Sequence, residues 1–167
     1  MLNRRTVFAA AALAAPATFA LWRPTPADAE ACATDKTAAN AALLERYVAA
    51  VNAHDTRSFA NIFTDTYLQR SGRSPPGLAA QIENAQRLFT ALPDLHLAIE
   101  DRIFGGDKIV ARCAYTGTQN GKFLGVEPTG KQIKFGTIDI WRVEGDKLAE
   151  HWDQVDLAGI LKQLREG

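Results

Sequence analysis

The spacing of the hydrophobic residues changes at Pro93, and this change restricts the chain to folds in which helices precede a sheet. Before Pro93, apolar residues recur every three or four positions, as at Leu44, Tyr47 and Val51, which is the spacing of one helix face. Beyond Pro93, apolar and polar residues alternate over 95–100, which is the period of a half-buried strand. The two separated patterns predict an α+β fold with helices and strands in distinct layers.

The individual elements can be placed by the same spacing and by turn signals. Asp55 is expected to cap a short helix, while Asn120-Gly121 and Gly145-Asp146 mark turns between strands. We expect helices over about 36–53, just after 55, over about 78–92 and after 156, a brief extended piece around 67–68, and long strands over 95–100, 109–119, 132–143 and 147–154. A strongly curved sheet wrapped around helices would make a cone, whose open mouth is a natural small-molecule site.

The first 29 residues have the features of an export signal. Arg4 and Arg5 precede an alanine-rich apolar stretch over 6–22, and Ala27-Asp28-Ala29 is a small-residue site of the kind that signal peptidase cleaves. The adjacent arginines resemble a twin-arginine signal, although the general secretory route stays open. We expect cleavage near Ala29, a periplasmic or secreted product without a membrane anchor, and one mature domain over 30–167.

The charge balance argues against one class of partner. The 19 Lys and Arg residues equal the 19 Asp and Glu residues, so the whole chain is formally neutral. Removal of residues 1–29 takes away three arginines and one aspartate, which leaves 16 basic and 18 acidic residues and a net charge of −2. A nucleic-acid-binding protein carries a basic excess, so we expect no nucleic-acid partner.

The cysteines and histidines do not form a metal-binding pattern. The three histidines are widely separated, without the short spacings that place two imidazoles on one metal ion, so we expect no metal. Cys32 and Cys113 are the two cysteines, which are too few for a disulfide-built scaffold. Whether these two thiols are paired or free stays open.

Several short segments, taken together, resemble one family. They are Leu92–Leu95, Tyr115–Thr118, Phe123–Lys131, Ile138–Arg142 and Glu150–Asp153, followed by Asp156. In this order and spacing the chain is similar to the SnoaL-like polyketide cyclases, also called ester cyclases, from about Leu44 to Leu164. The resemblance implies the nuclear-transport-factor-2-like fold, which is a cone-shaped, curved antiparallel sheet packed on N-terminal helices, and it implies a homodimer.

The same resemblance implies chemistry without a cofactor. The characterised cyclases close a ring on a polyketide ester by intramolecular aldol condensation, with an aspartate on the last strand as the acid/base. Asp153 occupies that position in this chain. A histidine on the preceding strand helps to bind the substrate in those enzymes, whereas this chain has Asp139 there. Asp153 is therefore the first candidate catalytic residue, and Asp139 is a departure from the family pattern.

The residues near these two carboxylates indicate how they could act. A carboxyl group that moves a proton at carbon works best when it titrates near neutral pH, which burial and a second carboxylate both promote. Asp139 could be that second carboxylate and divide the acid and base roles with Asp153. His151 could shuttle a proton or orient the carboxylate, or it could be a structural strand histidine. Aromatic side chains are the candidate substrate-binding walls: Phe63, Phe89, Phe135, Trp141 and Trp152.

The register of the last hairpin decides whether the two carboxylates meet. A two-residue turn at Gly145-Asp146 would set Asp139 opposite Trp152, with Asp153 on the other face of the sheet. One extra residue, inserted as a bulge, would set Asp139 opposite His151, with Asp153 on the shared face. We favour the second register, because it groups Asp139, Trp141, His151 and Asp153 together.

We therefore predict an exported, cofactor-free acid/base enzyme of the cyclase or isomerase type, acting by aldol-like chemistry on a small hydrophobic carbonyl compound. The alternative is a non-catalytic periplasmic module that binds a hydrophobic ligand. Epoxide-hydrolase-like or steroid-isomerase-like chemistry on the same fold is a third possibility. Buried carboxylates around an open pocket would favour the enzyme, whereas a filled cone with Asp153 paired to a surface cation would favour the binding module.

Overall fold

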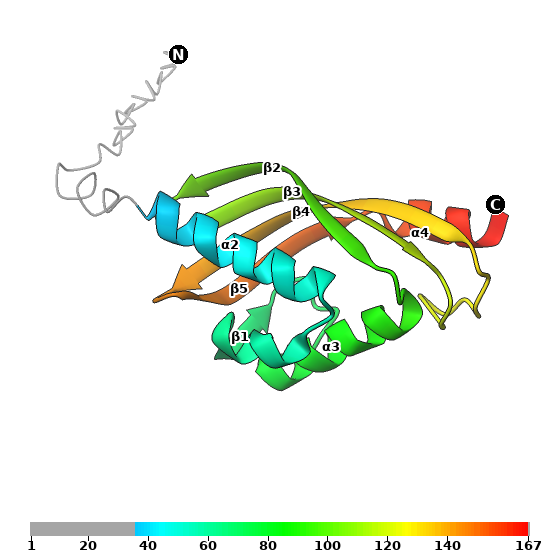
Figure 1. Ribbon diagram of the computed structural model, residues 1–167, viewed down its shortest axis with the longest axis horizontal. Coiled ribbons are helices and arrows are strands. Elements are labelled where there is room, and N and C mark those ends of the chain that lie inside the picture. The colour runs from blue at the N-terminus through cyan, green and yellow to red at the C-terminus, as the bar shows by residue number, and fades with distance from the viewer. Residues whose placement is uncertain (1–35, 167) are drawn as a thin grey trace, which may run out of the picture. The chain divides into compact units, whose positions relative to one another are not determined.

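The computed structural model describes residues 36–166, in which most of the helices come before most of the strands (Figure 1). The helices α2 (Thr37–Asn52), η1 (a 3-10 helix, Thr56–Asn61) and α3 (Leu78–Ala91) precede the last four strands, and α4 (Leu157–Glu166) follows them. The strands are β1 (Phe63–Gln69), β2 (His96–Gly105), β3 (Lys108–Thr118), β4 (Gln132–Glu144) and β5 (Lys147–Val155). The predicted export signal, its cleavage site and Cys32 lie outside the described residues. Within the described residues, no helix has the length and apolar character needed to cross a membrane.

The five strands form one sheet in the order β1-β5-β4-β3-β2. The strands β2 to β5 form an antiparallel meander, and β1 joins β5 in parallel at the sheet edge. Figure 1 shows the sheet curving around the helices, with α2 in contact with β2 and β3, and α3 in contact with β1. This architecture confirms the predicted α+β fold and the predicted curved sheet on N-terminal helices. The extended piece expected near 67–68 is the longer strand β1.

Side-chain hydrogen bonds fix the end of α2 and the start of η1, near the break between two helices that the sequence predicts. Asp55 caps η1 by accepting hydrogen bonds from the Arg57 backbone N–H at 3.2 Å and from the Ser58 hydroxyl at 2.6 Å. The Asn52 side chain, at the end of α2, exchanges hydrogen bonds of 2.7 and 3.0 Å with the backbone of Leu97. The end of α2 is therefore tied to the first long strand.

A β-bulge interrupts the last hairpin. The hairpin begins with Glu144 opposite Lys147, as a two-residue turn at Gly145-Asp146 requires. Ala149 then has no partner on β4, and the register beyond it is shifted by one residue. A one-residue shift exchanges the two faces of the following segment, because side chains alternate along a strand.

The bulge brings four predicted residues onto one face of the sheet. Asp139 lies directly opposite Asp153, and Trp141 lies opposite His151. The predicted grouping of these side chains is therefore present. The predicted pairing of Asp139 with His151 is wrong. The extra residue lies on β5, so it moves the partner of Asp139 from Trp152 to Asp153.

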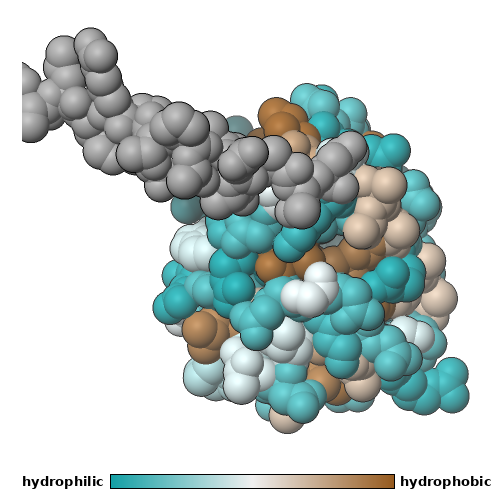
Figure 2. All heavy atoms as spheres, turned by 90° about the vertical axis from the view of Figure 1, so that its left-hand side faces the viewer, coloured by the Kyte–Doolittle hydropathy of each residue, from teal (hydrophilic) through white to brown (hydrophobic). Residues whose placement is uncertain are grey.

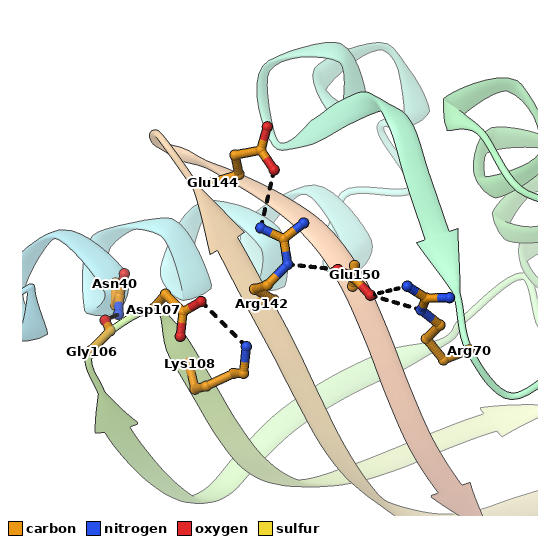
Figure 3. Close-up of polar contacts among 8 residues, drawn as sticks. All are labelled: Asn40, Arg70, Gly106, Asp107, Lys108, Arg142, Glu144 and Glu150. Carbon is orange, nitrogen blue, oxygen red and sulfur yellow. Dashed lines mark hydrogen bonds and ion pairs between the residues drawn. The ribbon is translucent and has the colours of Figure 1, made fainter. Parts of the chain in front are cut away.

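The outward face of the same strands carries a ladder of ion pairs (Figure 3). Arg142 on β4 binds Glu150 on β5 at 2.7 Å and Glu144 at 3.0 Å, and Arg70 binds Glu150 at 2.5 Å. Figure 2 views the end of the sheet where the hairpin turns lie, and its visible surface is mainly hydrophilic with small hydrophobic patches. Charged side chains thus line the part of the hairpin's outward face that lies near its turn.

Candidate active site

The helices and the inner face of the sheet border a cavity of about 450 Å³, which is a size typical of small-molecule sites. Its apolar walls include Leu88, Phe89, Tyr115, Phe123, Phe135 and Ile160. The rings of Tyr115 and Phe135 are stacked, with centroids 5.0 Å apart and planes at 6°. Phe89 and Phe135, two of the predicted wall residues, thus border the cavity.

Three other predicted wall residues lie elsewhere. Phe63 begins β1 and is completely buried in the core, with its ring 4.8 Å from that of Tyr67. Trp141 is 1% exposed and stacks on the His151 ring at 4.9 Å, outside the cavity lining. Trp152 is 37% exposed and faces outward, because it follows His151 on a strand whose side chains alternate.

Asp139 and His151 form a buried hydrogen-bonded pair at the cavity. His151 Nε2 lies 3.0 Å from Asp139 Oδ1, and the Thr137 hydroxyl donates to Asp139 Oδ2. The Gln69 amide nitrogen lies 3.1 Å from His151 Nδ1. With the amide donating, Nδ1 is an acceptor and Nε2 carries the hydrogen that is donated to Asp139. Both imidazole nitrogens and both Asp139 oxygens are therefore engaged within the protein.

Three groups near Asp139 stay protonated at neutral pH. Burial raises the pKa of the Tyr47 and Tyr115 hydroxyls well above the usual range, and the Asp139 carboxylate adds to both increases. Burial and the same carboxylate also raise the pKa of the Cys113 thiol. These side chains are neutral groups in the site, unsuited to act as a base or a thiolate nucleophile.

Asp153 is the other carboxylate that borders the cavity, and its two oxygens differ. Oδ2 forms an ion pair with Arg73, whose side chain is 42% exposed against 10% for Asp153. Oδ1 is buried and has no hydrogen-bond partner within residues 36–166. Asp153 Oδ1 is thus the cavity carboxylate oxygen that is free to accept a proton.

The parallel pairing of β1 with β5 brings two further polar residues to the site. Gln69, at the end of β1, lies beside His151, and the Arg70 N–H donates to the His151 carbonyl at 2.7 Å. Arg73 lies on the loop that follows. No local sequence pattern marks Gln69 or Arg73 as site residues, because the contacts that bring them here join segments about 80 residues apart. The Ser- and Gly-rich composition after β1 predicted only a loop.

The segment after β3 forms another part of the cavity border. Gln119 is completely buried, and its Oε1 accepts hydrogen bonds from the Thr129 backbone N–H at 2.7 Å and the Thr129 hydroxyl at 2.6 Å. Its amide nitrogen donates to the Gly121 carbonyl at 2.6 Å. One buried glutamine thus organises the loop from which Phe123 and Leu124 reach the cavity.

Residues 36–166 contain no group of three His, Cys, Asp or Glu side chains arranged to hold a metal ion. The fold and the site define a small α+β protein with a cone-shaped sheet and an apolar cavity that contains two carboxylates. The chain belongs to the SnoaL-like polyketide cyclase family, whose family model matches residues 41–164. The family has the nuclear-transport-factor-2-like fold that the sheet and helices form here, as the resemblance implied.

Solved structures show the same fold. TsrD from Streptomyces laurentii is 32% identical with a TM-score of 0.73, and the match covers 77% of this chain and 96% of TsrD. A proposed SnoaL-like polyketide cyclase from Jannaschia sp. CCS1 is 21% identical with a TM-score of 0.71, over 78% of this chain and 94% of that one. AclR from Streptomyces galilaeus, a proposed hydroxylase, is 26% identical with a TM-score of 0.67, and the match covers 76% of this chain and 96% of AclR. The curated proteins contain no match.

Proposed function

We propose that this protein is a cofactor-free acid/base enzyme of the cyclase or isomerase type, acting on a small hydrophobic carbonyl compound. The observation that carries the proposal is Asp153 Oδ1, a buried carboxylate oxygen without a partner that belongs to an apolar cavity. A base with this environment suits removal of a proton from a carbon atom next to a carbonyl group. Membership of the SnoaL-like polyketide cyclase family supports the same class of reaction.

The proposed step moves one proton. Asp153 Oδ1 takes the proton from carbon, the electrons of the C–H bond form the enolate, and the negative charge collects on the carbonyl oxygen. The enolate carbon then attacks a second carbonyl in the same molecule, and the Asp153 carboxyl returns the proton to the new alkoxide. Walls formed by Phe89, Tyr115 and Phe135 would hold an apolar ring system close to this base.

Asp139 and His151 receive a supporting role in this proposal. Their polar atoms bind one another, Thr137 and Gln69, so neither side chain has a free atom for proton transfer in this arrangement. The pair instead fixes the inner face of β4 and β5 on which Asp153 stands. This differs from the shared acid and base roles that the sequence suggested for Asp139 and His151.

The alternative of a non-catalytic binding module predicted that Asp153 would pair with a surface cation, and Arg73 is such a cation. The same alternative predicted a filled cone, which the cavity of about 450 Å³ does not fit. The cavity and the free Asp153 oxygen together favour catalysis.

The test is hydrogen–deuterium exchange in D2O at the activated carbon of a tetralone carrying a methyl ester next to its ketone. The protein should accelerate this exchange, and D153N should lose at least about a hundredfold, because general-base catalysis contributes factors of this size. D156N is the matched control, since Asp156 accepts the Gly159 N–H at the start of α4 and asparagine can do the same. Equal exchange by D153N and the unaltered protein would exclude Asp153 as the base.

We also propose export through the signal in residues 1–29, by the twin-arginine route, to the periplasm or the medium. The support is the Arg4-Arg5 pair, the apolar stretch after it and the small-residue site ending at Ala29. A reporter fused after Cys32 should be exported in bacteria, and replacing both arginines by lysine should stop export. Continued export of the lysine variant would indicate the general secretory route.

A homodimer is proposed on the resemblance and on the outward face of the sheet. Ile138, Ile140 and Trp152 are 45%, 37% and 37% exposed there, and together they leave apolar surface uncovered. Sedimentation should show a dimer in the unaltered protein and a monomer in I140E. A monomeric unaltered protein would contradict the proposal.

A further inference from the structure

We propose that Arg73, together with the hydroxyl of Ser74, binds the substrate oxygen on which negative charge develops. This inference rests on the proposed function, because it assigns the oxyanion site of the reaction that Asp153 begins. Arg73, Ser74 and Asp153 all border the same cavity.

The donors of this pair are available. Within residues 36–166 the Arg73 guanidinium bonds to Asp153 alone, through Nη2, so its remaining N–H groups are free. Ser74 Oγ is buried and has no hydrogen-bond partner there. An unpaired buried hydroxyl is costly, and a ligand oxygen placed beside it would satisfy it.

Three other hydrogen-bond donors at this end of the cavity are already engaged. The Thr137 hydroxyl and His151 Nε2 bind Asp139, and the Gln69 amide nitrogen binds His151. Arg73 is the cavity-lining cation in contact with the proposed base, whereas Lys122 pairs with Glu127, which lies outside the cavity lining.

The backbone holds Arg73 and Ser74 on a short segment fixed at both ends. The Arg70 N–H donates to the His151 carbonyl at 2.7 Å, and the Gly77 N–H donates to the Tyr67 carbonyl at 2.6 Å. Gly72, in between, has a φ of +72°, a conformation that glycine adopts without strain. The segment therefore presents its side chains to the cavity from anchors on β1 and β5.

The charge changes of the reaction suit a single guanidinium. Before proton transfer, Arg73 faces the Asp153 carboxylate. When Oδ1 takes the proton from carbon, Asp153 becomes neutral and the carbonyl oxygen becomes negative. The guanidinium then faces an oxyanion in place of a carboxylate, so the number of charges in the cavity stays constant and the transition state is stabilised without large reorganisation.

The experiment uses two benzisoxazoles, one with a nitro and one with a chloro substituent on the benzene ring. A base removes the ring C–H proton, the C–H electrons form the nitrile, and the N–O bond breaks to release a cyanophenolate. The nitro group spreads the charge of the phenolate oxygen, whereas the chloro compound leaves more of that charge for the protein to stabilise. Turnover of both compounds is followed by absorbance.

R73Q is expected to lose about tenfold in kcat on the nitro compound and about a hundredfold on the chloro compound, with a small change in KM. R73K should recover most of the loss, and S74A should lose about fivefold on the chloro compound. R112Q is the matched control, because Arg112 forms a similar ion pair with Glu100 on the outward face. Circular dichroism of each variant checks that the fold is kept.

Equal losses on both compounds in R73Q, or no loss, would overturn this inference. The proposed base, Asp153, and the proposed oxyanion site, Arg73 with Ser74, can be contradicted separately. If D153N turns over both compounds like the unaltered protein, the proposed base is wrong. If D153N is inactive while R73Q and S74A match R112Q, the base stands and only the oxyanion site is wrong.

Discussion

The two faces of the β4–β5 hairpin place similar residues in opposite environments. On the inner face, Asp139 is 2% exposed and binds His151 and Thr137. On the outer face, Glu150 binds Arg70 and Arg142 with partners that are 46% and 28% exposed. Water can replace the outer contacts but not the inner ones, so the inner contacts should contribute more to stability.

The pKa shifts follow the same division. Beside the inner face, burial and the Asp139 carboxylate raise the pKa of the Tyr47 hydroxyl on α2 and of the Cys113 thiol on β3, so these two groups stay neutral. On the outer face, hydrogen bonds from Arg70 and Arg142 lower the pKa of Glu150, so it stays charged. The inner face of this hairpin thus favours chemistry, and the charged part of its outer face around Glu150 favours solvation.

The largest expected effect comes from the inner pair of Asp139 and His151. D139A leaves two neutral donors, the His151 N–H and the Thr137 hydroxyl, buried without an acceptor, so we expect a loss of about 2 to 5 kcal/mol in unfolding free energy. D139N keeps one acceptor oxygen and should lose about half as much. Urea denaturation of both variants measures this, and a loss below that of an outer-face variant would contradict the comparison of the two faces.

Much of the fold could be predicted from local patterns. Helical spacing and alternation predicted α2, α3 and the four long strands, and Asp55 and Gly145-Asp146 act as the expected cap and turn. These features depend on neighbouring residues, which is why the sequence reveals them. The candidate base, Asp153, came from the family resemblance.

The remainder of the site depends on contacts between distant segments. The bulge at Ala149 places a small buried residue in an ordinary strand pattern, with no glycine to mark it. Gln69 and Arg73 reach the cavity only because β1 pairs with β5. The misplaced aromatic residues have the same cause: the face of Trp152 and the depth of Trp141 depend on the register, which local spacing leaves open.

The smallest expected effect belongs to the outer ladder, and it depends on pH. E150Q should reduce the unfolding free energy by about 1 kcal/mol at neutral pH, because Glu150 contacts two arginines near the surface. The folded protein lowers the pKa of Glu150 below its usual 4.5, so this contribution is fully present above that pH. It is lost as the pH falls through the lower folded value, where the carboxylate becomes protonated and the two proteins become equally stable.

Urea denaturation of E150Q and the unaltered protein from neutral pH downward measures this difference, which added salt should also reduce. E83Q is the matched control, because the Glu83–Arg87 pair is exposed on both sides and should contribute only about 0.3 kcal/mol. A difference that persists at low pH, or one as large as that of D139A, would mean that the outer ladder behaves as a buried network. The two faces would then not differ in how much their polar contacts contribute to the free energy of unfolding.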